Sequence, residues 1–159
     1  MSSSNLPRYP TKGLRRALDR DWLALLHRDG PTRFLISLPE PPAAFNRARH
    51  EFNQGEYWRC HETLEGLWLE EAYPLRIYYH AIIKAAVGML HLTRHNGQGA
   101  LSKLRDAEFG LTPFLPSFMG VDTEELRRQV VERLSYLEAV VRVDWPALDE
   151  LPPAQIRSR

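Results

Sequence analysis

The chain has 159 residues, enough for one domain with short appendages, because single hydrophobic cores commonly organise about 100–200 residues. Its composition, 43% hydrophobic and 26% charged, is too apolar for a disordered chain and too charged for a membrane-embedded one. A formal net charge of +1 creates no general field that attracts nucleic acid, so we expect no nucleic-acid partner.

A single cysteine, Cys60, excludes an internal disulfide and any cysteine-rich zinc site, and is compatible with a reducing compartment. Residues Met1–Tyr9 lack the apolar core of a signal peptide, and no stretch reaches the roughly 18 apolar residues that span a bilayer. We therefore expect a soluble, cytoplasmic protein with no membrane role.

The first 42 residues predict one helix followed by a proline-rich linker. Apolar residues recur at helical spacing over Gly13–His27, and Gly30-Pro31 ends the pattern. Further prolines then exclude regular helix, so Thr32–Pro42 is expected to be extended. We treat residues 1–42 as an amino-terminal helix and linker.

Residues 43–115 contain four helical segments separated by turn signals. Gly55 supplies the positive φ that commonly closes a helix, Pro74 breaks the chain again, and Asn96-Gly97 marks a third turn. The predicted helices are Ala43–Phe52, Glu56–Glu71, Leu75–Arg94 and Gln98–Phe109.

Residues 116–159 predict a last helix and a tail belonging to the same globular domain. Asp122 is spaced from Glu125 as in a variant of the capping box, and an apolar repeat follows at Leu126, Val130, Leu134, Leu137 and Val141. Prolines and a polar end from Trp145 onward predict a tail that lies on the surface or frays. About six helices joined by short turns indicate an all-α fold, either an antiparallel helical bundle or stacked helical hairpins.

The third predicted helix carries polar residues on its apolar face. On a helical wheel Tyr57, Cys60, Leu64, Leu67 and Trp68 cluster together. His61 and Glu65 fall beside them, with Glu62 at the edge. We therefore expect a buried histidine and at least one buried carboxylate, and that carboxylate requires a partner because burying an unpaired charge is costly.

The fourth predicted helix offers partners in a basic stripe of Arg76, His80, Lys84, His91, Arg94 and His95. The simplest packing sets this stripe against the acidic edge of the third helix. In the plainest interpretation, Arg76 or Lys84 pairs with Glu65 in a structural network, because most buried polar groups are simply satisfied.

Two other interpretations use the same residues for chemistry. His61 and Glu65, at i and i+4, could ligate one divalent metal as His-Glu-x-x-His does, giving a His-Glu-x-x-Glu hydrolase with Glu62 as general base. Alternatively, the basic stripe, through Arg76, His80 and Lys84, receives an anionic small molecule, with Glu62 or His61 as acid or base.

The segment Phe52–Trp68, FNQGEYWRCHETLEGLW, resembles the signature F-N-x-G-x-Y-x-x-x-H-E-x-L-E-x-x-W of the prokaryotic domain of unknown function 309 family. The stretch Arg76–Leu92 is similar to that family's second helix, and the whole similarity spans about Ala43–Leu115. The chain departs from the family where glutamine and glycine are expected, having His80-Ala81 and Lys84. The resemblance implies a small all-helical domain and no defined activity.

We therefore predict a helical binding or scaffold domain of unassigned activity. Its candidate ligand-binding or network residues are Asn53, Tyr57, His61, Glu65, Trp68, Arg76, His80 and Lys84. The alternatives are the metal-dependent hydrolase and a helical-hairpin module that binds a protein partner or a second copy of itself. A hairpin module predicts an exposed apolar patch on the second or fifth helix.

Overall fold

A computed structural model describes residues 12–38, 40–139 and 142–159, so Val141 and the prediction over Met1–Tyr9 lie outside the described residues. The helices are α1 (Lys12–Asp29), α2 (Ala43–Asn53), α3 (Tyr57–Glu70), α4 (Leu75–Thr93), α5 (Gly97–Leu111), α6 (Thr123–Leu137) and α7 (Trp145–Asp149), with 3₁₀ turns η2 (Thr32–Phe34) and η3 (Thr112–Phe114). The described ranges contain no strand beyond isolated bridges, which confirms the all-α prediction.

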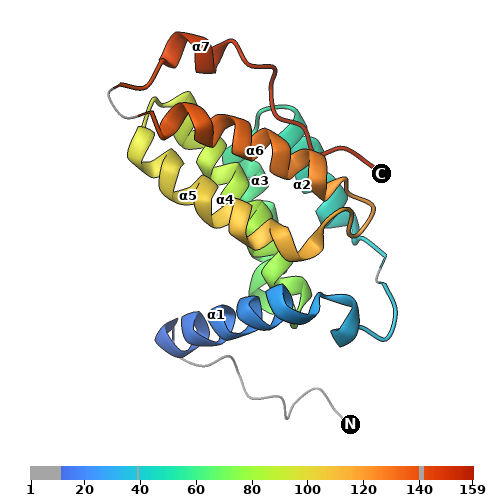
Figure 1. Ribbon diagram of the computed structural model, residues 1–159. Coiled ribbons are helices and arrows are strands. Elements are labelled where there is room, and N and C mark those ends of the chain that lie inside the picture. Colours follow the sequence, from blue (N-terminus) through green and yellow to red (C-terminus); the bar gives the residue numbers. More distant parts are fainter. Residues whose placement is uncertain (1–11, 39, 140–141) are drawn as a thin grey trace.

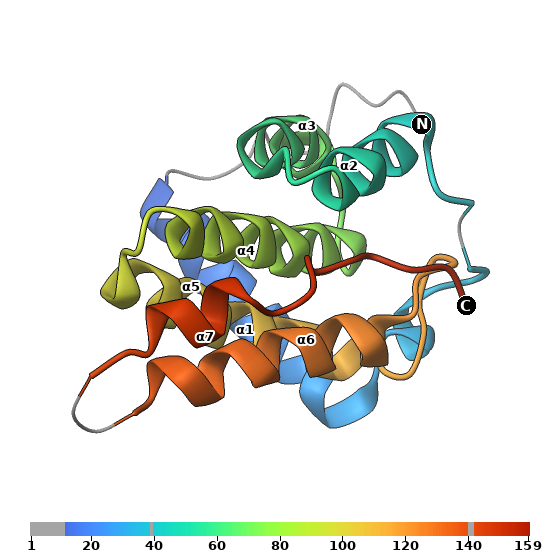
Figure 2. The same cartoon turned by 90° about the horizontal axis from the view of Figure 1, so that it is seen from above.

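Helix α4 lies at the centre of the molecule. It packs against α3 on one side and α5 on the other, while α2 packs on α3 and α6 on α5. Figure 2 shows α4 between the α2–α3 pair and the α5–α6 pair. Helix α1 lies across one end of this bundle, where it contacts α4 and η3 (Figure 1).

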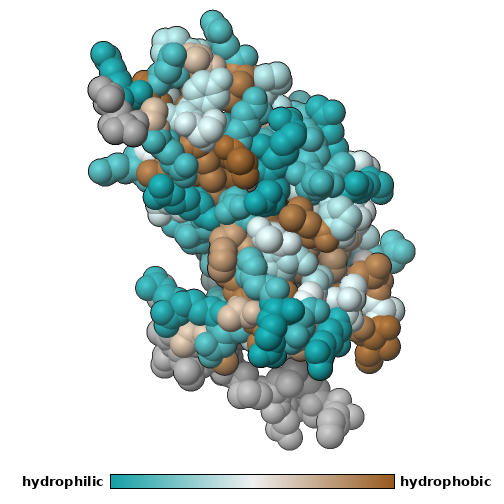
Figure 3. Space-filling view, in the orientation of Figure 1, coloured by the Kyte–Doolittle hydropathy of each residue, from teal (hydrophilic) through white to brown (hydrophobic). Residues whose placement is uncertain are grey.

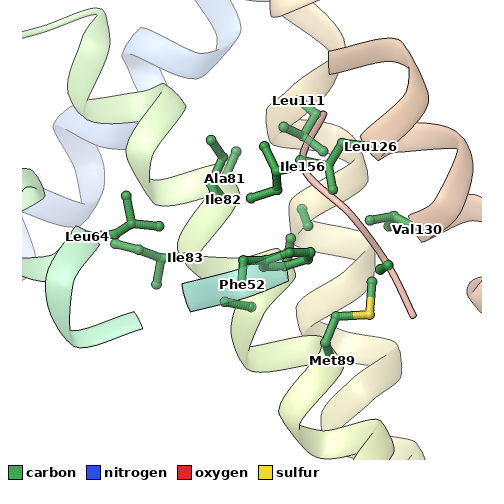
Figure 4. Packing of buried hydrophobic residues seen from close by; sticks show 14 of the residues in the cluster. Phe52, Leu64, Ala81, Ile82, Ile83, Met89, Leu111, Leu126, Val130 and Ile156 are labelled. Atoms are coloured by element: carbon green, nitrogen blue, oxygen red, sulfur yellow. The ribbon is translucent and has the colours of Figure 1, made fainter. Parts of the chain in front are cut away.

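The central position of α4 follows from its sequence. Most of its circumference is apolar, and twelve of its residues are buried, including Tyr78, Ile82 and Ala86. Figure 4 shows Ile82 and Ile83 packing in the cluster that Phe52 of α2 and Leu64 of α3 enter from one side. A helix that is apolar nearly all round has to be surrounded by other elements.

Local signals place the helix ends as the sequence predicts. Gly55 follows α2 with φ +77°, a conformation that costs glycine little. The side chain of Asp122 accepts a hydrogen bond from the Glu125 N–H at 3.0 Å and so caps α6. Asn96 caps α5 in the same way through the Gly99 N–H, also at 3.0 Å.

The carboxyl-terminal tail differs in part from its prediction. Residues Trp145–Asp149 form a seventh, short helix capped by Asp144, and the tail after it is mostly exposed but inserts two side chains. Ala154 and Ile156 are each only 1% exposed. The extended tail sends these alternate apolar side chains inward, a two-residue period that its prolines and polar neighbours conceal.

The surface is that of an ordinary globular domain. On the face shown in Figure 3, hydrophilic side chains divide the apolar surface into separate patches. None of the helices in the described part of the chain is long and apolar enough to cross a membrane.

Candidate functional site

A groove of about 980 Å³ opens where α1 lies across α3, α4 and α5. Four of the residues singled out in the sequence line it: Glu65, Trp68, His80 and Lys84. Lining residues from α1 and α5, which the sequence did not indicate, are Arg16, Asp19, Arg20, Leu23, Asp106, Phe109 and Gly110. Their role depends on how helices distant in sequence meet, and no local pattern reports that.

Arg76 lies beneath the groove and supports Trp68. Its side chain is 0% exposed, and its guanidinium carbon lies 4.1 Å from the centroid of the Trp68 ring. Its Nη1 donates to the Trp68 carbonyl at 2.7 Å, and its Nε donates to Asp19 Oδ1 at 3.1 Å. Arg76 thereby joins α1, α3 and α4.

The sequence predicted that Arg76 or Lys84 pairs with Glu65, but the counter-charge of Arg76 lies on another helix. Asp19 of α1 takes that role and also accepts a hydrogen bond from the Tyr73 hydroxyl. Burial, followed by this bond, raises the pKa of Tyr73. The buried charge is thus compensated from the crossing helix.

His80 forms one aromatic wall of the groove. Its ring stacks on Trp68 with centroids 4.9 Å apart and planes 28° apart. Burial, with the nearby Lys84 charge as the second cause, lowers the pKa of His80 to about 4. The imidazole is therefore uncharged at neutral pH and offers one donor and one acceptor.

Lys84 stands one helical turn further along α4. Its Nζ lies 3.6 Å from Asp106 Oδ2 on α5, so its counter-charge also comes from a helix other than α3. Burial, then repulsion from Lys103, lowers the pKa of Lys84. The prediction that the basic stripe packs against acidic residues of the third helix is therefore wrong for Lys84 as well as for Arg76.

His61 and Glu65 form a pair near the surface. His61 Nε2 lies 3.4 Å from Glu65 Oε2, and their side chains are 20% and 45% exposed. The His61 ring stacks on the exposed Trp58 at 4.9 Å, and Glu62 is exposed. The helical wheel overestimated the burial of Glu65. It assumes one apolar face, whereas α3 packs against α2 on one side and α4 on the other.

The buried carboxylate belongs to Glu51 of α2. It is 6% exposed and accepts a hydrogen bond from the Thr63 hydroxyl at 2.7 Å. The sequence did contain a signal for it, since Phe45, Ala48 and Phe52 recur at helical spacing and Glu51 falls beside Ala48 on that face. Beside it, burial and then the Glu51 charge raise the pKa of Cys60 to about 12, so this thiol is unreactive at neutral pH.

Two other predicted residues lie away from the groove. Tyr57 packs edge-on against Phe52 with ring centroids 5.3 Å apart, and burial raises its pKa. Asn53 binds the backbone of Ile156 in the tail through both atoms of its amide. The family resemblance singled out Asn53 as a candidate ligand-binding or network residue, and in the structure its partner is a segment more than a hundred residues away.

The metal interpretation keeps two of its donors in contact, His61 and Glu65. Within the described ranges, however, no group of three or more histidine, cysteine, aspartate or glutamate side chains comes close enough to hold one ion. The metal-dependent hydrolase therefore remains a prediction.

Part of the chain matches a known protein family. Residues 45–102 match the family described as "Domain of unknown function (DUF309)". This match confirms the resemblance over α2, α3, α4 and the start of α5, and it leaves α1, α6 and the tail outside. The groove thus combines helices of the matched segment with α1, which precedes it, and with α5, where the match ends.

A distant relative extends the similarity without adding an activity. An uncharacterized protein of Aquifex aeolicus is 24% identical over 122 residues, or 76% of this chain. The aligned region is only 35% of that protein's length. No solved structure matches this chain. The activity is therefore unassigned, and its chemistry has to be argued from the groove.

Proposed function

We propose that this domain binds a small amphipathic molecule carrying an acidic group, in the groove between α1, α3, α4 and α5. Its volume of about 980 Å³ is at the upper end of the range typical of small-molecule sites. The observation that carries the proposal is the division of the lining into an apolar, aromatic side and a polar side that includes an uncharged histidine.

The apolar side supports binding of a hydrocarbon or aryl body. Leu69 and Phe109 line the groove and are 42% and 53% exposed, and Leu23 and Trp68 continue the same surface. Large apolar side chains gathered around a cavity are better covered than left in water. The indole N–H of Trp68 is buried and has no acceptor among the described residues, so its ring contributes apolar surface to the groove.

The polar side supports recognition of an acid. Arg16 and Arg20 of α1 line the groove, and neither makes an ion pair within the described part of the chain. Lys84 is more buried and forms an ion pair with Asp106. His80, neutral at pH 7, adds a hydrogen-bond donor without adding charge. A carboxylate or phosphate would meet these groups while its apolar part contacts Trp68.

Thermal melting with defined probes tests the proposal. We expect octanoate and 4-phenylbutyrate to raise the melting temperature, and the uncharged amides of the same acids to raise it less, because ligands that bind only the native state stabilise it. Arg20→Gln and Lys84→Gln should each weaken octanoate binding by about tenfold, the effect of losing one charge-assisted contact.

The matched control is Arg94→Gln, which removes an exposed cation at the carboxyl-terminal cap of α4, outside the groove, and should leave octanoate binding unchanged. Acids that fail to shift the melting of the folded parent protein would contradict the proposal. Equal shifts for acids and amides would restrict the site to apolar recognition and would remove the role of the arginines and Lys84.

We also propose that the protein acts in the cytoplasm. A single thiol, buried and with a raised pKa, suits a reducing compartment but does not require one. Cell fractionation with an antibody to the native chain tests this. The partner is then a metabolite-sized acid, while a protein partner or a homodimer stays a prediction that gel filtration and cross-linking can examine.

A further inference from the structure

The tail from Pro152 to Ser158 is bound as peptide ligands are, through its backbone. Ile156 N–H donates to Asn53 Oδ1 at 2.7 Å, and Asn53 Nδ2 donates to the Ile156 carbonyl at 3.1 Å. The Gln129 amide does the same for the preceding residue, accepting from Gln155 N–H at 2.7 Å and donating to the Gln155 carbonyl at 2.9 Å. Two side-chain amides thus hold two consecutive residues.

A second pair of residues extends this grip by one helical turn on each side. Arg133 donates to the Pro152 carbonyl at 2.7 Å, and Arg49 donates to the Ser158 hydroxyl at 2.9 Å. Arg49 and Asn53 are an i,i+4 pair on α2, and Gln129 and Arg133 are an i,i+4 pair on α6. We call these four residues the tail seat.

Side-chain recognition accompanies the backbone contacts. Ala154 and Ile156, two residues apart on an extended segment, point to the same side and are 1% exposed. Figure 4 shows Ile156 in the same cluster as Leu126 and Val130 of α6. Backbone hydrogen bonds that give affinity, with pockets for alternate side chains that give specificity, are the pattern by which proteins bind extended peptides.

The tail also covers the seat. Gln129 and Arg133 are only 5% and 6% exposed with the tail in place, and their amide and guanidinium donate to its carbonyl groups. When the tail leaves, these donors face water, and another extended segment that presents carbonyl groups can take its place. Asn53 belongs to the family-matched segment, whereas the tail lies outside it, so that segment does not supply its own occupant.

We propose that the tail seat is a recognition site for an extended peptide from another protein, and that residues 152–158 are its tethered, competing occupant. The partner segment presents a small residue, a branched aliphatic residue two positions later, and a polar or basic end, as in Ala154, Ile156 and Ser158. A tethered occupant acts at an effective concentration on the order of millimolar, so the external peptide binds well only after the tail is displaced.

The test uses the full chain carrying Ile156→Asp, which places a charge where an apolar side chain is buried and so releases the tail. A fluorescent synthetic peptide of residues 150–159 is titrated by anisotropy. We expect it to bind the folded variant at least about tenfold more tightly than the native chain, because the native tail competes. Adding Asn53→Ala should abolish binding, whereas Asn46→Ala, an exposed asparagine on the same helix, should not.

Several results would overturn the proposal. A folded Ile156→Asp chain that binds no peptide, or binds it equally with Asn53→Ala, shows that the seat is only packing. If Ile156→Asp does not fold, a full chain with a protease site inserted after Glu150 is cut and mixed with the labelled peptide, which should exchange with the cut tail. Absence of exchange refutes the site, and native dimers that swap tails assign the seat to a second copy instead.

Discussion

Helix α4 meets its neighbours α5 and α1 through different kinds of side chain. Towards α5 the helices approach closely, since a Cβ placed on Gly110 would lie 2.9 Å from the Ala81 Cβ. Towards α1 the same helix presents Arg76, His80 and Lys84 at intervals of one turn. Small side chains allow α4 and α5 to meet beside the groove, whereas the longer side chains of His80 and Lys84 line it, and Arg76 ties α4 to Asp19 of α1. One helix therefore builds both the core and the candidate site.

The largest effect should come from removing the charge beneath the groove. Arg76→Met deletes the ion pair with Asp19 and the hydrogen bond to the Trp68 carbonyl, and leaves Asp19 with no cation at a position that is only 14% exposed. We expect a loss of about 3–5 kcal/mol in the free energy of unfolding, measured by urea denaturation. Arg94→Met, an exposed change at the carboxyl-terminal cap of the same helix, should stay within about 0.5 kcal/mol. A loss below about 1 kcal/mol for Arg76→Met would show that apolar contacts alone dock α1.

The close contact of α4 with α5 is tested by adding volume beside the groove. Gly110→Val should cost about 1–3 kcal/mol, because its Cβ meets Ala81 and neither helix can move without disturbing the core. Gly66→Ala is the matched control: a Cβ there meets nothing within 4 Å, so the same urea denaturation should show a gain of about 0.5–1 kcal/mol from better helix propensity. Similar costs at both glycines would mean that the close approach of α4 and α5 is not a constraint.

His80 should make the stability of the folded protein fall in mild acid. Its folded-state pKa of about 4 lies below the usual 6.5, so between these values the unfolded chain binds a proton that the folded chain does not. Stability therefore falls as the pH drops from 6.5 towards 4, by on the order of 2 kcal/mol. Denaturation at several pH values should show that His80→Gln removes this part of the slope. Parallel pH profiles for the parent and the variant would contradict the assigned burial of His80.

The sequence predicts features that depend on near neighbours and misses those that depend on how separate helices pack. Helix positions, the Asp122 cap and the Gly55 turn were predictable because each depends on neighbours within a few residues. Trp68, His80 and Lys84, which line the groove, were singled out because helical periodicity reports which residues share a face. The partners were not found: Asp19 is separated from Arg76 by α2 and α3, Asp106 lies on the helix that follows the one carrying Lys84, and both roles depend on how α1 and α5 dock.

The smallest effect concerns the carboxylate on which the sequence placed most weight. Glu65 is 45% exposed and its pair with His61 is near the surface, so Glu65→Ala should change stability by about 0–0.5 kcal/mol at pH 7. Glu51→Ala is its counterpart and should cost about 1–3 kcal/mol, since it leaves the Thr63 hydroxyl without its acceptor. Thermal and urea denaturation of the two variants measure the difference directly. The reverse order would restore Glu65 as the buried member of a network, and would mean that the α3 face towards the groove is closed in solution.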